Sequence, residues 1–265
     1  MEHFEQFLDE LHLEDLHNPA HPSIFDENEE YNMLIVRMPI LGETLEAQSL
    51  GFIIAGENSF LYNRDIKKFD TLDDLFLGPY KIIDTMTDVL LKSFSKYQDL
   101  IADREELLYE NGTPDSFMTD WIRLKRDILH IQRILERTSE AILEMMNYYE
   151  ETPGFPVNNY RDMHEHIDRI IRSTVHQLSK LDYLYSFYSA RTNDKINKMI
   201  YVLTIISAIF LPLNLLVGFF GINVGGLPFM NSGESGAVNV FLVMFASVAL
   251  TFAVILLWHK KVQEQ

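Results

Sequence analysis

The 265-residue sequence predicts an α+β fold. A reduced N-terminal α/β domain precedes a long helical stalk, which continues into the first of two transmembrane helices. Three observations lead to this prediction. Strand-like runs are confined to residues 31–63, helical patterns dominate from residue 72 onward, and two later runs carry no charged side chain. We expect an N-terminal domain at residues 1–80, a stalk at 81–198, a two-helix transmembrane domain at 199–258 with a connecting loop at 221–236, and a tail at 259–265.

The expected sheet comes from three short segments rich in β-branched and aromatic residues. Glycine and asparagine punctuate them, as is typical of strands joined by tight turns. The segments are "YNMLIVRMPI" at 31–40, "QSLGFIIAG" at 48–56 and "NSFLYN" at 58–63.

The stalk is expected to consist of helices separated by proline and glycine. A short helix at 73–77 should end at Gly78-Pro79, with longer helices at 80–110 and 117–151. After Pro156 no proline or glycine occurs until Pro212, so one helix should begin near residue 158 and enter the membrane. At about 60 residues it would be ~90 Å long, which is typical of a coiled coil or a membrane span.

Two uncharged runs of 22 residues each, 199–220 and 237–258, are the expected membrane spans. A helix needs about 20 apolar residues to cross the hydrocarbon layer. The alternative is a pair of buried helices in a globular core. Core helices seldom remain uncharged on every face over such a length.

The flanking charges predict the orientation. Lys195 and Lys198 precede the first run, Lys260 and Lys261 follow the second, and the loop at 221–236 has no Lys or Arg. By the positive-inside rule, both termini are cytoplasmic and the loop is external. The acidic N-terminus does not resemble a signal peptide. We therefore expect a multi-pass protein of the cell (inner) membrane.

The cytoplasmic part is strongly acidic. Residues 1–195 hold 37 Asp and Glu but only 19 Lys and Arg, a net charge of −18. This field repels nucleic acid and concentrates cations, although it could also serve only to keep the domain soluble. The absence of cysteine excludes disulfides and thiolate zinc sites. No catalytic signature is present, so neither an enzyme nor a resident cofactor is expected.

A polar stripe runs along the first span and its approach. Alternating steps of three and four residues join Asn197, Ile200, Thr204, Ser207, Leu211, Asn214 and Gly218. The opposite face is wholly apolar, so the stripe should face protein or water. Pro212 has no backbone N–H, so the Ala208 carbonyl lacks its usual helical hydrogen bond and adds a polar oxygen at this depth. Two interpretations remain open: polar contacts between the two helices, or the wall of a pore, which would need a ring of subunits.

The stretch "KMIYVLTIISAIFLPLNLLVGFFGIN" ends in Gly221, Ile222 and Asn223. It resembles the pore helix of the CorA family of divalent-cation channels, which has Gly-Met-Asn at these positions. The loop "GINVGGLP" resembles the zinc-transporting, ZntB-like branch. "HLEDLHN" at 12–18 resembles the family's Glu-Asp box, and "YRDMHEH" at 160–166 its acidic, metal-contacting stretch.

The resemblance implies a funnel-shaped homopentamer that conducts Zn²⁺, Mg²⁺ or Co²⁺. The pore would be lined by Asn197, Ile200, Leu203, Ser207, Leu211, Asn214 and Gly218, which differs from the stripe only in Leu203 for Thr204. Gly221, Ile222 and Asn223 would form the mouth. Five Asn223 amide oxygens can hydrogen-bond the water shell of a hydrated dication. The loop favours zinc, but Ile222 in place of methionine leaves the ion open.

The resemblance also implies a regulatory metal site. Asp15 of one subunit would lie near Asp162 of its neighbour, with Glu14 and His166 close by. Asp162 and His166, four residues apart, share one helix face. A bridging dication would favour the closed state, and solvated acidic charges are the alternative. Because the Glu-Asp box falls at residues 14 and 15, we expect either an N-terminal sheet smaller than usual for the family or the loss of the start of the chain.

Two other interpretations of the sequence remain open. His12, His17 and His21 could bind metal, although their spacing fits no helical ligand set. A pentameric membrane metal sensor or scaffold that does not conduct is the alternative to a transporter.

Overall fold

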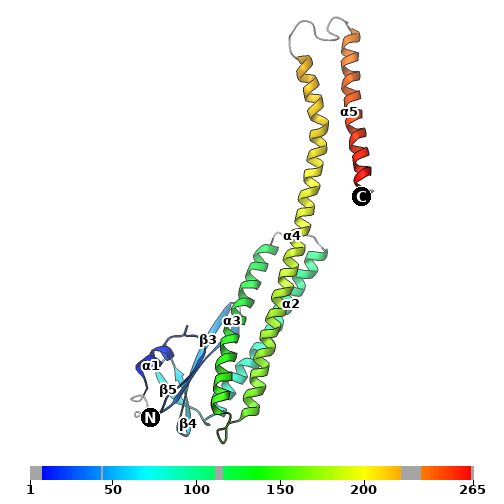
Figure 1. Cartoon of the computed structure of the whole chain (residues 1–265). Coiled ribbons are helices and arrows are strands. Elements are labelled where there is room, and N and C mark those ends of the chain that lie inside the picture. Colours follow the sequence, from blue (N-terminus) through cyan, green and yellow to red (C-terminus); the bar gives the residue numbers. More distant parts are fainter. Residues whose placement is uncertain (1–7, 43, 111–115, 222–233, 264–265) are drawn as a thin grey trace. The chain divides into compact units, whose positions relative to one another are not determined.

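The computed structural model describes residues 8–42, 44–110, 116–221 and 234–263 (Figure 1). The chain divides into two compact units, Met1–Tyr188 and Ser189–Gln265. The first unit holds a β-sheet and a bundle of long helices. The second holds the end of the longest helix and the last helix. The expected α+β class, with a sheet domain and a long helix, is confirmed.

The sheet is a five-stranded antiparallel meander with strand order β1-β2-β3-β4-β5. Its strands are β1 (Ile24–Glu27), β2 (Asn32–Leu41), β3 (Leu45–Ala55), β4 (Asn58–Asn63) and β5 (Lys68–Thr71). The three expected strands match β2, β3 and β4. The two edge strands were not expected, because each is four residues long and carries charged residues that leave no clear alternation.

Glycine permits two features of this sheet. Gly56 has φ of 58° in the two-residue turn that joins β3 to β4, a conformation that favours glycine. Gly51 lies under helix α1 (Glu10–His17), where an added Cβ would come within 2.3 Å of the Leu16 side chain. Leu16 is fully buried, so this close approach fixes α1 on the sheet.

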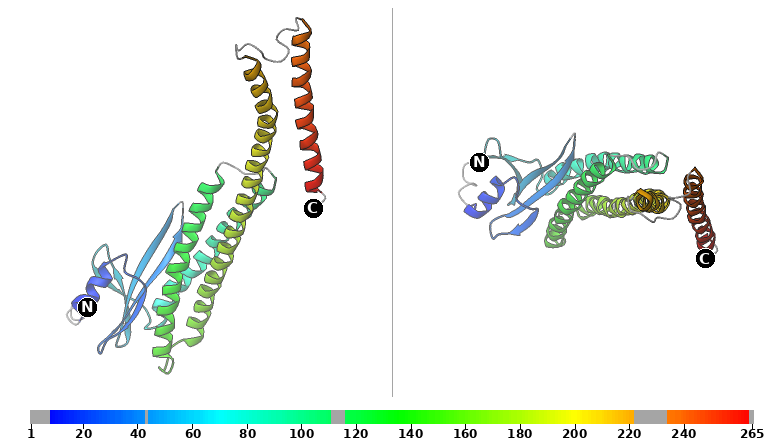
Figure 2. Two further views of the ribbon diagram at one scale, coloured as in Figure 1. Left: turned by 45° about the horizontal axis from the view of Figure 1, so that its top comes forward. Right: turned by 90° about the horizontal axis from the view of Figure 1, so that it is seen from above.

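Three long helices run side by side in the first unit (Figure 2). They are α2 (Leu77–Glu110), α3 (Phe117–Tyr149) and the first part of α4 (Val157–Gly221). The expected short helix at 73–77 is wrong. The Asp74 carboxylate accepts hydrogen bonds from the backbone N–H groups of Phe76 and Leu77, at 3.0 and 2.7 Å, and so caps α2. Gly78 and Pro79 fall in the first turn, where proline is tolerated.

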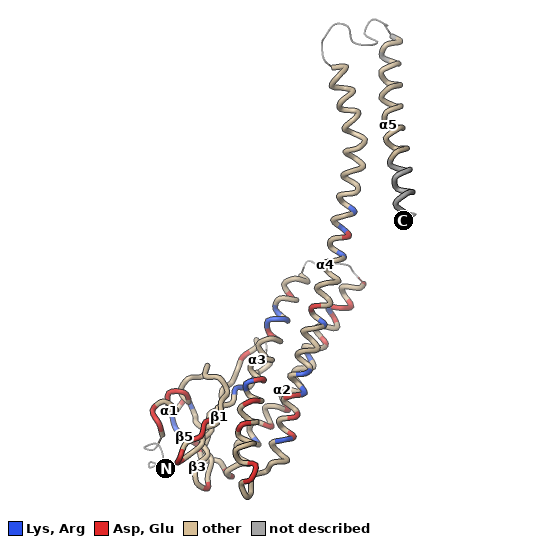
Figure 3. The backbone as a smooth tube through the Cα atoms, viewed as in Figure 1, with Lys and Arg blue, Asp and Glu red and all other residues tan. Residues whose placement is uncertain are grey.

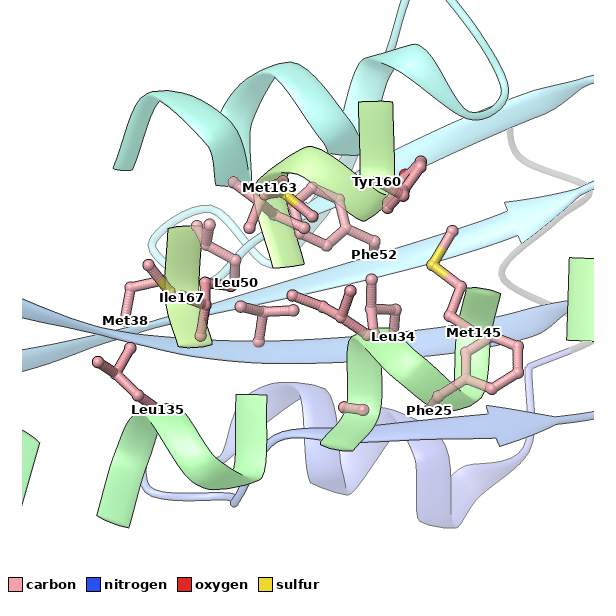
Figure 4. Packing of buried hydrophobic residues seen from close by; sticks show 14 of the residues in the cluster. Phe25, Leu34, Met38, Leu50, Phe52, Leu135, Met145, Tyr160, Met163 and Ile167 are labelled. Carbon is pink, nitrogen blue, oxygen red and sulfur yellow. The ribbon is translucent and has the colours of Figure 1, made fainter. Parts of the chain in front are cut away.

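The main core lies between these helices and one face of the sheet (Figure 4). Residues of β2 alternate between the two faces, as the two-residue period of a strand requires. Leu34 and Val36 point toward the helices, whereas Met33 and Ile35 pack with Leu16 of α1. Side chains from α3 and α4 cover the face of the sheet that is turned toward the helices. Among them are Leu135, Met145, Tyr160, Met163 and Ile167.

A second cluster joins the three helices farther along the bundle. It contains Ile101, Leu108, Phe117, Leu124, Ile128, Leu181 and Leu184. Stacked aromatic pairs reinforce it: Trp121 lies 4.9 Å from Tyr185, and Phe117 lies 4.6 Å from Tyr188, between ring centroids. The packed part of α4 thus ends at the boundary between the two units.

The second unit contains the last part of α4 and helix α5 (Glu234–Gln263). Figure 3 shows that α4 carries no Lys, Arg, Asp or Glu beyond Lys198. In the described part of the chain, α4 is the one helix long and apolar enough to cross a membrane, and Val238–Val254 of α5 is a shorter apolar segment. The 65 residues of α4 agree with the length expected from the sequence.

Candidate functional site

The polar stripe of α4 is exposed to its full length in the single chain. Asn197, Thr204, Ser207, Asn214 and Gly218 are all exposed. The apolar members are exposed as well: Ile200 by 55%, Leu203 by 64% and Leu211 by 76%. Within the part of the chain that the structure describes, nothing covers this surface.

A second stripe of α4 is less exposed. Its half-buried members are Ile205, Ala208, Ile209, Pro212, Leu213, Leu216 and Phe220. They recur every three or four residues and so share one helix face, nearly opposite the polar stripe. Helix α5 has a half-buried set of its own at Asn239, Val240, Met244, Ser247, Val248 and Thr251. The half-buried face of α4 lies nearly opposite its polar stripe, and we infer that it is the half-buried face that is turned toward α5.

Three hydroxyl groups in these helices, those of Thr204, Ser247 and Thr251, bond to their own backbone. Thr204 donates to the Ile200 carbonyl at 2.8 Å, and Thr251 donates to the Ser247 carbonyl at 2.8 Å. This back-bonding satisfies a hydroxyl without a partner helix. These hydroxyls therefore need no polar contact between α4 and α5 of one chain.

The expected mouth lies at the end of α4. Gly221 is the last residue of the helix, whereas Ile222 and Asn223 lie outside the described residues. At both Gly218 and Gly221 an added Cβ would meet no atom of the described residues within 4 Å.

The predicted regulatory residues occupy two places in the first unit. Glu14 is exposed on α1, and the Asp15 carboxylate lies 3.3 Å from His21 Nε2. Helix α1 packs on one face of the sheet and α4 belongs to the layer on the other face. Asp15 and Asp162 of one chain are therefore separated by the sheet. A shared site would need two subunits.

Asp162 and His166 lie together on α4, with 3.9 Å between Asp162 Oδ1 and His166 Nε2. The other ring nitrogen of His166, Nδ1, is buried and has no hydrogen-bond partner among the described residues. A buried nitrogen without a partner is costly unless something else binds it.

Sequence reasoning missed a third group beside this pair. Burial and the nearby Asp88 raise the pKa of Asp84 on α2, which also interacts with His166, Asp162 and the Tyr80 hydroxyl. Burial likewise raises the pKa of Tyr80. The spacing of Tyr80, Asp84 and Asp88, four residues apart each time, was the available signal, since it places them on one helix face.

The acidic cluster does not form a closed metal cage in a single chain. Among the described residues, no group of three or more His, Cys, Asp or Glu side chains is arranged to hold a metal ion. The cluster of Asp84, Asp162 and His166 supplies oxygen and nitrogen donors from two helices, and further ligands would have to come from elsewhere.

The N-terminal histidines contact other side chains of the protein and are not grouped as ligands of one metal site in the described structure. His12 lies 2.8 Å from the Tyr31 hydroxyl and 3.2 Å from Asp26, through its two ring nitrogens. His17 Nε2 lies 2.9 Å from the Tyr62 hydroxyl. These contacts hold α1 against the sheet.

A serine, a histidine and an aspartate also meet between α3 and α4. Ser139 Oγ lies 2.9 Å from His164 Nε2 and donates to Asp168 at 3.0 Å. Because the single hydroxyl proton goes to Asp168, His164 must donate to Ser139 and cannot act as its base. The group therefore links two helices and is not arranged as the serine–histidine–aspartate triad of hydrolases.

Two curated relatives show partial similarity. The Vibrio parahaemolyticus "Zinc transport protein ZntB" is 27% identical over 156 residues, which is 58% of this chain and 49% of the relative. The Thermotoga maritima "Cobalt/magnesium transport protein CorA" is 26% identical over 171 residues, 63% of this chain and 47% of the relative. The matched region thus spans about half the length of these relatives.

Solved structures share the fold over almost the whole chain. The CorA magnesium transporter of Methanocaldococcus jannaschii superposes with a TM-score of 0.76 at 15% identity, covering 94% of this chain and 83% of its own. Full-length CmaX superposes with a TM-score of 0.71 at 19% identity, covering 94% and 80%. The family model "CorA-like Mg2+ transporter protein" matches residues 4–261. The chain is therefore a member of the CorA-like family.

Proposed function

We propose that the protein transports divalent metal cations across the cell membrane through a pore formed by a ring of subunits. One observation carries the proposal. The polar stripe of α4 is exposed and points away from α5, although polar side chains at membrane depth need protein or water. Copies of α4 around a water-filled pore would give the stripe that environment.

The assembly we propose is a homopentamer with a funnel-shaped cytoplasmic part. Two helices of one chain cannot enclose a pore, so α4 of each subunit contributes one wall. Both uncharged segments span the bilayer, the loop at 221–236 is external and both termini are cytoplasmic. The lysines at both cytoplasmic flanks and their absence from the loop support this orientation.

The pore wall would combine polar and apolar rings. Ser207 and Asn214 offer oxygen atoms to the water shell of an ion, whereas Ile200 and Leu203 form an apolar constriction that can gate by dewetting. The Gly221-Ile222-Asn223 mouth would select for a hydrated dication, because Mg²⁺ keeps several waters when bound. A ring of five amides attracts such an ion without holding it as tightly as five carboxylates would.

We further propose that cytosolic metal closes the pore. Asp15 of one subunit and Asp162 of its neighbour would bind a dication, with Glu14 and His166 nearby. The structure adds Asp84 to the groups that support this site, since it lies beside Asp162 and His166. Metal would neutralise the repulsion between carboxylates at each interface and so stabilise the closed state.

The test is a competition flux assay with the full-length protein in liposomes. We expect uptake of Zn²⁺, Mg²⁺ or Co²⁺ above that of empty liposomes, with Ni²⁺ as a further competitor. The relatives named for zinc and for cobalt and magnesium leave the preferred ion to this measurement. The external loop favours Zn²⁺.

The same assay addresses the alternative of a membrane metal sensor or scaffold. Absence of flux for every cation, from a protein that remains oligomeric in the liposome, would contradict transport and support the alternative. Flux of monovalent and divalent cations alike would contradict selection by the mouth.

A further inference from the structure

An open groove of about 920 Å³ lies on the surface of the first unit, distant in sequence from the transport features. Its walls come from the middle of α2, the N-terminal half of α3 and the residues where β2 turns into β3. This volume lies within the range of small-molecule sites. The groove goes beyond the proposed function and does not depend on it.

The groove is basic, although the cytoplasmic part of the chain is acidic. Its described lining contains five Lys and Arg side chains against a single acid, Asp127. Asp127 is already bound by Arg126 at 3.1 Å. The groove is therefore a positive concavity within a domain of net charge −18.

Three of its basic side chains, one of them a histidine, have no acidic partner among the described residues. Among the described residues, Lys96, His130 and Arg133 form neither a hydrogen bond nor an ion pair. Lys96 comes from α2, whereas His130 and Arg133 come from α3, so they approach the groove from two walls. The partner that such an arrangement lacks is an anion with more than one charged oxygen.

The groove also exposes apolar side chains. Leu100 is exposed by 39%, Ile122 by 54% and Leu129 by 38%, and all three belong to the lining. Inorganic anions gain nothing from such a wall. An anion with an apolar body would cover it, and removing that surface from water stabilises the complex.

We propose that this groove binds a small organic phosphate. Guanidinium and ammonium groups form strong, charge-assisted hydrogen bonds with phosphate oxygens, and the apolar wall accommodates the rest of the ligand. A long polyanion does not fit this assignment, because the negative field of the whole domain repels it.

The experiment uses the full-length protein in detergent micelles with EDTA and follows the fluorescence of Trp121, which lines the groove. Trp258 is replaced by Phe so that Trp121 is the only tryptophan. ATP is the probe, and inorganic tripolyphosphate is the matched anion without an apolar body. We expect ATP to change the Trp121 fluorescence and to bind more tightly than tripolyphosphate.

Charge-reversal variants locate the binding. Arg133→Glu and Lys96→Glu, one on each wall, should each weaken ATP binding by about tenfold or more. The matched control is Arg137→Glu, one helical turn beyond Arg133 and outside the lining, where Arg137 pairs with Glu140 at 3.1 Å. It should change the affinity by about twofold or less.

Three results would overturn the proposal: no fluorescence change with millimolar ATP, equal affinity for ATP and tripolyphosphate, or equal weakening by Arg137→Glu and Arg133→Glu. Arg133 and Lys96 are both exposed, so their replacement should leave the fold intact, which circular dichroism verifies. If one variant fails to fold, the other still tests its wall.

Discussion

The two parts of α4 differ in what surrounds them. Before Tyr188 the helix buries a residue at every third or fourth position, from Tyr160 and Met163 through Ile167 to Leu184. In its apolar part nothing is buried: the share is 0% over the most apolar 18 residues. Both parts are rich in apolar side chains. The first finds its partners within the chain, and in the proposed assembly the second finds them in lipid and in other copies.

The exposed part shows a further difference between its own faces. The face toward α5 is apolar, whereas the opposite face carries amides, hydroxyls and glycine. If lipid alone surrounded α4, there would be no reason to place polar groups on one side. This difference teaches that the exposed part has two kinds of neighbour, and the predictions below test each contrast in turn.

The largest effect should come from the polar face. Asn214→Leu places an apolar side chain on the proposed pore wall, and we expect it to abolish most of the metal flux into liposomes, because the ion loses a polar contact and meets added bulk. The control is Leu213→Ala, at the adjacent position on the face toward α5, which should retain most of the flux. Equal losses in the two variants would remove the distinction between the faces.

The packed part should show its effect in stability. Ile167 is fully buried against the sheet, so Ile167→Ala should lower the free energy of unfolding of the first unit by about 2–5 kcal/mol. Leu211→Ala, at a side chain that is 76% exposed, should change it by about 0.5 kcal/mol or less. Denaturant unfolding followed by Trp121 fluorescence, with Trp258→Phe as background, measures both. A large effect of Leu211→Ala would show that the two parts of α4 do not differ in this way.

A smaller effect is expected from the regulatory residues. The double variant Asp15→Asn, Asp162→Asn should leave basal flux intact and reduce its inhibition by metal inside the liposome, because the proposed bridging site loses two carboxylates. The measurement is flux against internal metal concentration, with the oligomer verified. Asp99→Asn, at an exposed acid on α2, is the control. Unchanged inhibition in the double variant would contradict the regulatory site.

The smallest effect concerns Asp84. Burial and Asp88 raise its pKa, so the folded state favours the protonated acid. The contribution of Asp84 to stability is then present below its unfolded pKa, near 4, and is lost as the pH rises through its raised folded pKa. In EDTA, Asp84→Asn should therefore raise Tm slightly at pH 7 and not at pH 4. A lower Tm at pH 7 would show that the charged carboxylate is stabilising.

Sequence patterns predicted the parts of the molecule that depend on local periodicity. The length of α4 follows from the absence of proline and glycine, and strands β2 to β4 follow from their apolar content. The polar stripe was likewise visible as a repeat of three and four residues. The sequence did not predict the direction in which the stripe faces relative to α5, because that direction depends on which apolar face of α4 packs against α5.

Features that depend on contacts between distant segments could not be read from the sequence. Asp84 joins Asp162 and His166 only because α2 and α4 pack in one bundle, and the basic groove arises where α2, α3 and a β-turn meet. The start of α2 was missed for a local reason: the side chain of Asp74 caps the helix, so Gly78 and Pro79 lie inside it.

The central claim is that the polar face of α4 lines a water-filled pathway. The chain has no cysteine, so single cysteines can be introduced without altering the background. A charged, membrane-impermeant thiol reagent should modify cysteines at positions 207, 214 and 218 and block metal flux, and transported metal should slow the modification. Cysteines at positions 206, 210 and 217, on the rest of the helix surface, should react little and leave flux unchanged. Equal reactivity on both faces, or modification at 207 and 214 without loss of flux, would contradict the account.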